Sequence, residues 1–236
     1  MLKELGINKK VRRAYGIDEI ALVPGKRTLD YDLTDASWSI GNYKREVPII
    51  ASAMDSVVDV NTAVELTKLG ALGVINMEGI QTRYQNPGEI LHKITSVGKN
   101  EFVPLMQKIY SESIKEELIL QRINEVKEKG GIAALSGTPQ AALKYREILN
   151  NSKLDLFFLQ GTVVSTEHLG IDGNKSLNIK DLCQDMNVPI IASAMDSVVD
   201  VNTAAELTKL GALGVINMEG IQTRYENPDE ILNQIA

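Results

Sequence analysis

The sequence predicts an α/β protein of parallel strand–helix units, a TIM-barrel-like fold in which about six of eight units are present. Short apolar runs rich in β-branched residues recur along the chain without polar alternation, as in buried parallel strands. Segments with helical patterning separate these runs, which is typical of a barrel or a doubly wound sheet. The segment 47–91 recurs as 188–232, four units later, which is half a turn of an eightfold barrel.

The individual elements can be assigned from local signals. We expect Asn61 to cap a helix over 62–69 that ends at Gly70, and the sequence Asn86-Pro87-Gly88-Glu89 to open the next helix. No Gly-x-Gly-x-x-Gly follows the first strand, so a Rossmann nucleotide site has no support. The six strands are expected to start near residues 47, 72, 132, 154, 188 and 213, with further helices over 113–129, 139–149 and 178–186 and a long polar loop over 161–176.

The duplication is nearly perfect. The two copies differ only at Val64/Ala205, Gln85/Glu226 and Gly88/Asp229. We therefore divide the chain into an N-terminal extension with short strands, residues 1–46, and a barrel-like domain, residues 47–236. With two units missing, the barrel would be incomplete, with an open sheet edge and exposed apolar helix faces, so we expect a homo-oligomer.

Composition narrows the class of protein. The 236 residues carry a net charge of −6, which argues against a nucleic-acid surface. Cys183 is the single cysteine, so no intramolecular disulfide forms, and this fits a reducing compartment. No apolar run reaches the roughly 18 residues of a membrane span, and the charged N-terminus does not resemble a signal peptide. We expect a cytoplasmic protein without membrane partners.

Several segments resemble the IMP dehydrogenase/GMP reductase superfamily, and its shorter subgroup without CBS domains in particular. The resemblance runs from residue 10 to about 187 and is carried by the segments 13–24, 47–57, 72–76 and 156–162. It implies a TIM barrel, usually in tetramers, that acts on a purine nucleotide (IMP or GMP) with NAD or NADP through a catalytic cysteine. It therefore implies an oxidoreductase.

Site residues follow from the resemblance and from the position of strand ends. By resemblance, Ser52 and Met54 match residues that contact the nucleotide, and Gly161 and Thr162 lie in the cofactor-side loop. Barrel active sites form at the carboxyl ends of strands, where these residues are expected. The full substrate-binding set is Ser52, Met54, Asp55, Asn76, Ser193 and Met195.

The sequence departs from the family where the chemistry is done. The catalytic-cysteine position holds Asn217-Met218-Glu219-Gly220, and the late phosphate loops and Arg-Tyr flap have no counterpart. We therefore predict no catalytic residue and little or no turnover. The alternative is a non-catalytic remnant that acts through self-association or residual nucleotide binding. A flavin-dependent barrel would need a glycine-rich loop near the C-terminus, and none is present.

Other chemically reactive residues have structural interpretations. We expect Cys183 to be an inert side chain on a helix, and the pairs Arg83-Tyr84 and Arg224-Tyr225 to act as loop clamps. Asp55 and Asp196 either face each other across the barrel mouth or hold the turns after their strands, and the second reading is favoured. The two histidines, His92 and His168, have no metal-ligand spacing.

Overall fold

The centre of the molecule is a curved parallel sheet whose strands follow one another in chain order. A computed structural model describes residues 2–4, 10–12, 19–21, 23, 25–26, 29–161, 167–168, 177–194, 199–218, 220–227 and 230. Val74 separates β6 from β7, and its N–H donates to the carbonyl of Ala51 in β5 at 3.2 Å, so the two short segments form one strand position. In sheet order the strands are β5 (Ile50–Ala51), β6 (Leu72–Gly73) with β7 (Ile75–Asn76), β8 (Ala134–Gly137), β9 (Leu156–Leu159), β12 (Ile190–Ala192) and β13 (Leu213–Gly214).

This order confirms the predicted fold class. A doubly wound sheet reverses its strand order at a switch point, whereas a barrel keeps neighbouring strands consecutive. All six predicted strands form, and all are parallel. Among the described residues β13 and β5 do not pair, so the barrel is not closed.

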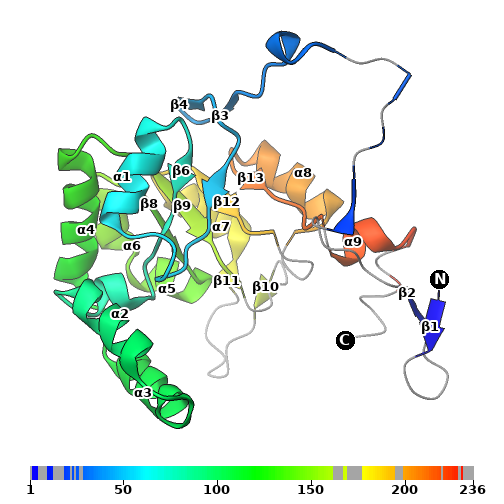
Figure 1. The fold of residues 1–236 in the computed structure, drawn as a ribbon. Helices are drawn as coiled ribbons and strands as arrows, with labels where there is room; N and C mark the ends of the chain where they lie inside the picture. Colours follow the sequence, from blue (N-terminus) through cyan, green and yellow to red (C-terminus); the bar gives the residue numbers. More distant parts are fainter. Residues whose placement is uncertain are drawn as a thin grey trace.

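Helices cover the outer face of the sheet (Figure 1). The pair formed by α2 and α3 is an addition to the second unit, and α3 was not predicted because Pro104 interrupts its pattern. The predicted helix over 139–149 is divided at Tyr145. The helices are α1 (Val60–Lys68), α2 (Pro87–Ser96), α3 (Lys99–Ser111), α4 (Glu116–Glu128), α5 (Pro139–Lys144), α6 (Arg146–Asn151), α7 (Ile179–Asp185), α8 (Val201–Lys209) and α9 (Ile221–Arg224), with 3-10 turns over Tyr31–Leu33 and Ile80–Thr82.

The start of α1 differs from the prediction. Its N-cap is Asp59, whose carboxylate accepts a hydrogen bond from the N–H of Thr62 at 2.7 Å, so the assignment of Asn61 was wrong by two residues. Gly70 ends the helix with a φ of 85°, a conformation that glycine adopts without strain, as predicted. Asp200 caps α8 in the same way, so the duplicated sequence repeats its local structure.

The core has two layers, one on each face of the sheet. Side chains that alternate along each strand point either outward to the helices or inward to the barrel interior. The outer layer includes Ile75, Leu135 and Phe157 against Ile119 and Ile123 of α4. The inner layer is smaller, and its buried members are Ile40, Leu72, Val74, Ile132, Ala134, Leu156, Phe158 and Ile191.

A β-hairpin covers the amino ends of the strands. It consists of β3 (Trp38–Ile40) and β4 (Tyr43–Arg45), which pair antiparallel. The Tyr43 hydroxyl donates to the Asp155 carboxylate at 2.5 Å, and Lys127 forms an ion pair with the same carboxylate at 2.7 Å. Burial and the bond to Asp155 raise the pKa of Tyr43 to about 12. This cluster fixes the hairpin to α4 and to the start of β9.

The two copies share their local structure but not their surroundings. Val60 and Met77 are 7% and 0% exposed, whereas their equivalents Val201 and Met218 are 64% and 61% exposed. In the first copy, α1 packs against α4 and β7 pairs with β8. In the second copy, β13 is the edge strand of the described sheet. Equivalent side chains are therefore part of the core in the first copy and form an exposed apolar surface in the second.

The remaining described strands are short and antiparallel. β1 (Leu2–Glu4) pairs with β2 (Lys10–Arg12) within the N-terminal extension. β10 (Glu167–His168), which lies within the predicted polar loop, pairs with β11 (Leu177–Asn178), which directly follows that loop. Within the described part of the chain, no helix combines the length and apolar character that crossing a membrane requires.

Candidate functional site

A cavity of about 270 Å³ opens at the carboxyl ends of the strands. Its wall comes from the segments that follow β5, β9 and β12, which the sequential strand order brings to one end of the sheet. The side chains that give the cavity its polar groups and its larger apolar surfaces are those of Ser52, Met54, Ser136, Phe158, Gln160 and Ser193. The location is the one at which barrel proteins build their active sites.

The structure brings three of the predicted site residues together. Ser52, Met54 and Ser193 line this cavity. Asp55 and Asn76 lie beside a neighbouring cavity of about 360 Å³, which shares Met54 with the first and extends under α2 and α3. Gly161 is buried after β9 and lines neither cavity. The other two predicted residues, Thr162 and Met195, lie outside the described residues.

Asp55 is bound by the protein itself. Its carboxylate accepts hydrogen bonds from the N–H of Ile80 at 2.8 Å and from the hydroxyl of Tyr110 at 2.7 Å. Burial and the bond to Asp55 raise the pKa of the Tyr110 phenol. A side chain at Gly79 would collide with the carboxylate, so the loop after β7 is shaped around it. These contacts agree with an aspartate that holds the turn after its strand, and Asp196 lies outside the described residues.

Arg83 and Tyr84 hold the same loop from the other side. The Nε and Nη2 atoms of Arg83 donate to the carbonyl of Glu78 at 3.1 and 3.0 Å, and Nη1 donates to the carbonyl of Glu112. The Tyr84 hydroxyl donates to the carbonyl of Ile109 at 3.0 Å. The pair therefore joins the loop to the end of α3, as the loop-clamp interpretation predicts.

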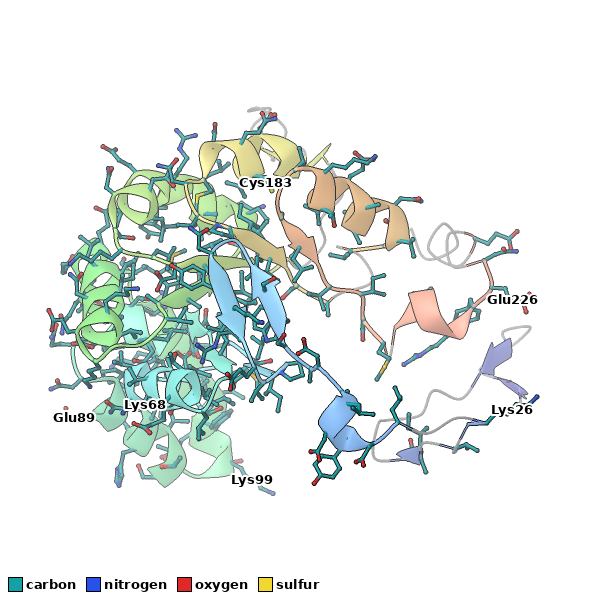
Figure 2. All side chains as sticks on the ribbon, turned by 90° about the horizontal axis from the view of Figure 1, so that it is seen from above. Lys26, Lys68, Glu89, Lys99, Cys183 and Glu226 are labelled. Carbon is teal, nitrogen blue, oxygen red and sulfur yellow. The ribbon has the colours of Figure 1, made fainter. Side chains whose placement is uncertain are left out.

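Cys183 is remote from the cavity. It lies on α7 and packs half-buried against the outer core layer, on the helix side of the sheet (Figure 2). Burial raises the pKa of its thiol to about 11. The thiol is therefore protonated at neutral pH, which agrees with the predicted inert role.

The two histidines of the chain lie on separate elements. His92 is exposed on α2, and His168 belongs to β10. No group of three or more histidine, cysteine, aspartate or glutamate side chains in the described segments has an arrangement that could hold a metal ion.

Sequence reasoning missed two polar residues of the cavity, Ser136 and Gln160. Ser136 lies one residue beyond the apolar run predicted as the third strand, and Gln160 ends the run of the fourth. Strand alternation could have found them, because Ala134 and Phe158, two residues earlier, face the barrel interior. Their position at strand ends was the available signal.

The cavity carries no formal charge. Among its described lining residues there is no Asp, Glu, Lys, Arg or His side chain. Serine hydroxyls and one carboxamide supply both donors and acceptors, and Phe158 and Met54 supply apolar surface. This arrangement can hold a neutral planar ring by hydrogen bonds at its edge, but it offers no acid, base or nucleophile of shifted pKa.

Comparison with known proteins shows sequence similarity to oxidoreductases. No family model matches the chain. An uncharacterized oxidoreductase of Mycolicibacterium smegmatis and one of Mycobacterium leprae are each 30% identical to it over 234 residues, covering 97% of this chain and 61% of theirs. The chain thus spans about three fifths of the length of these relatives. An inosine-5'-monophosphate dehydrogenase of Methanocaldococcus jannaschii is 31% identical over 100 residues, 42% of this chain and 19% of that protein.

A solved structure extends the similarity to the fold. The crystal structure of an IMP dehydrogenase/GMP reductase-like protein from Corynebacterium glutamicum matches with a TM-score of 0.75 and 28% identity, covering 91% of this chain and 57% of that one. Similarity in sequence and similarity in fold thus coincide over nearly the whole chain. The chain is therefore similar in sequence and in fold to the IMP dehydrogenase/GMP reductase superfamily.

Proposed function

We propose that this chain binds the base of a purine nucleotide, IMP or GMP, in the cavity at the carboxyl ends of the strands, with little or no oxidoreductase turnover. The observation that carries the proposal is the convergence of Ser52, Met54 and Ser193, from two separate strand ends, on one cavity. The relative from Methanocaldococcus jannaschii is named for a reaction of inosine monophosphate, which supports this ligand class.

The proposed lack of turnover rests on the missing nucleophile. By resemblance, turnover would proceed through a cysteine that forms a covalent intermediate with the purine ring. Asn217 and Met218 occupy the strand-end segment after β13, and Cys183 lies in the outer layer with a raised pKa. None of the described residues that line the cavity carries a thiol.

A nicotinamide cofactor, NAD or NADP, which the resemblance implies, does not fit this cavity together with a nucleotide. Its volume of about 270 Å³ lies just below the roughly 300–1,000 Å³ typical of ligand pockets. The described lining residues include no cationic side chain that could bind a pyrophosphate. These residues therefore support binding of one ring system, and no hydride-transfer step follows from them.

Calorimetry and an absorbance assay test the two halves of the proposal separately. Titration of the full chain with IMP and with GMP should show binding in the micromolar range, and a silent titration would refute the proposed site. Incubation with IMP and NAD, or with GMP and NADPH, should leave the absorbance at 340 nm unchanged. Clear turnover would refute the proposed inactivity.

A blocking variant locates the binding. Ser52→Trp places an indole into the cavity and should abolish the calorimetric signal. Ser96→Trp is the matched control, because Ser96 is exposed on α2 and its hydroxyl bonds only within its own helix. Equal binding by both variants would place the nucleotide elsewhere.

Self-association is the second candidate function, and the exposed apolar side chains of the second copy favour it. Val201, Leu213 and Met218 are 64%, 38% and 61% exposed, beside the edge strand β13. Exposed apolar patches and open sheet edges promote association. Sedimentation velocity should show a homo-oligomer at micromolar concentration, and a stable monomer would exclude this function.

A further inference from the structure

Ser136 contains a buried polar atom that no described residue of the protein satisfies. Ser136 is 0% exposed, and its Oγ has no hydrogen-bond partner among the described residues. Buried hydroxyls in folded proteins are usually paired, because leaving one unpaired is destabilising. An unpaired hydroxyl at the base of a cavity therefore points to a partner that arrives with a ligand.

Strand register places this hydroxyl in the cavity floor. Ser136 lies opposite Asn76 on one side and Phe158 on the other, and paired residues of a parallel sheet project from the same face. Phe158 belongs to the inner core layer, so Ser136 also faces the barrel interior. Gln160, two residues after Phe158, lines the cavity above it.

We infer that Ser136 and Gln160 form a hydrogen-bonding floor that recognises the lactam edge of a planar ring. This inference rests on the proposed function and specifies the part of the base that is recognised. A lactam presents a carbonyl acceptor beside an N–H donor. The Gln160 carboxamide and the Ser136 hydroxyl can each donate and accept, so together they match both groups. Phe158 supplies the apolar surface against which such a ring packs.

The test compares the unpaired buried hydroxyl of Ser136 with a buried hydroxyl that already has a hydrogen-bond partner, that of Thr82. Ser136→Ala removes the unpaired hydroxyl, so affinity for IMP should fall roughly five- to tenfold while the melting temperature stays the same or rises. Thr82→Val is the matched control, because the Thr82 hydroxyl is 0% exposed and already donates to the carbonyl of Met77 at 2.5 Å. It should lower the melting temperature and leave the IMP affinity unchanged. Unchanged affinity in Ser136→Ala would overturn the inference while the proposed function stands.

A single-ring probe separates this inference from the purine proposal. On the isotopically labelled full chain, 2-pyridone, which has a lactam edge, should shift the amide resonance of Ser136, whereas pyridine should not. If neither IMP nor GMP binds but 2-pyridone produces this shift and Ser136→Ala abolishes it, the floor is supported and the purine proposal is refuted. If 2-pyridone and pyridine behave alike, the lactam-reading floor is refuted.

Discussion

The duplicated segment allows one substitution to be made twice in the same sequence context. Met77 is fully buried in the outer core layer and its N–H bonds to the carbonyl of Ser136, whereas Met218, its copy, is 61% exposed. Truncation of a buried methionine to alanine removes transfer free energy and leaves a cavity, for a total of about 3 kcal/mol within the usual range of 2–5. Truncation of the exposed copy should change the free energy of unfolding by less than about 0.5 kcal/mol.

These energies translate into melting temperatures that can be distinguished. For a protein of this size, 1 kcal/mol corresponds to roughly 2–4 °C, so Met77→Ala should lower the melting temperature by about 6–12 °C. Met218→Ala should lower it by no more than about 2 °C. Urea titration followed by circular dichroism gives the same comparison in free energy. Val60→Ala and Val201→Ala form a second pair with the same contrast in exposure.

The comparison refutes the structural reasoning if both copies respond equally. Equal large losses would mean that the second copy is covered as completely as the first, for instance by a subunit interface. Repeating the Met218→Ala measurement at several protein concentrations distinguishes that case, because stabilisation by association depends on concentration.

Three further predictions follow from single contacts. Cys183 should react slowly with Ellman's reagent in the native protein at pH 8, because a pKa of about 11 leaves roughly one thiol in a thousand ionised. In urea the same thiol should react rapidly. A rapid reaction in the native protein would contradict the burial of α7. The pKa of Tyr43 is about 12 in the folded protein and near 10 in the unfolded chain, so its contribution to stability is complete below pH 10 and is lost as the pH rises through 12. In urea titrations, the free energy of unfolding should therefore fall less steeply over this interval in Tyr43→Phe than in the wild type. Parallel curves would refute the bond to Asp155. Asp59→Ala should lower the free energy of unfolding by about 1 kcal/mol through loss of the α1 cap, whereas Asn61→Ala should lower it by less. A larger loss in Asn61→Ala than in Asp59→Ala would instead identify Asn61 as the cap.

Much of the fold could be predicted because the strands are marked by uniform apolar runs. All six predicted strand positions formed, in the order that a half-turn duplication requires. The cap of α1 could not be chosen from sequence, since Asp59, Asn61 and Thr62 are all polar and close together, and only backbone geometry selects Asp59. Helix α3 was missed because Pro104 lies inside it.

The site was predictable in position but less so in composition. Ser52 and Met54 follow a recognisable strand, so their place at the cavity was expected. Strand alternation places Ser136 at the cavity, but only the three-dimensional structure shows that its hydroxyl is buried without a partner among the described residues. Likewise, the helical pattern of α4 gives no signal that Lys127 forms an ion pair with the buried Asp155.

The cluster around Asp155 also has a kinetic consequence. The bond between Tyr43 and Asp155 joins positions 112 residues apart, so the hairpin cannot reach its final place until β9 has been added to the sheet. Closing a long loop carries an entropic penalty before the contact forms, and folds rich in such distant contacts reach the native state slowly. The N-terminal hairpin should therefore be among the last elements to become protected from hydrogen exchange during refolding, even though it precedes every strand of the parallel sheet in the chain.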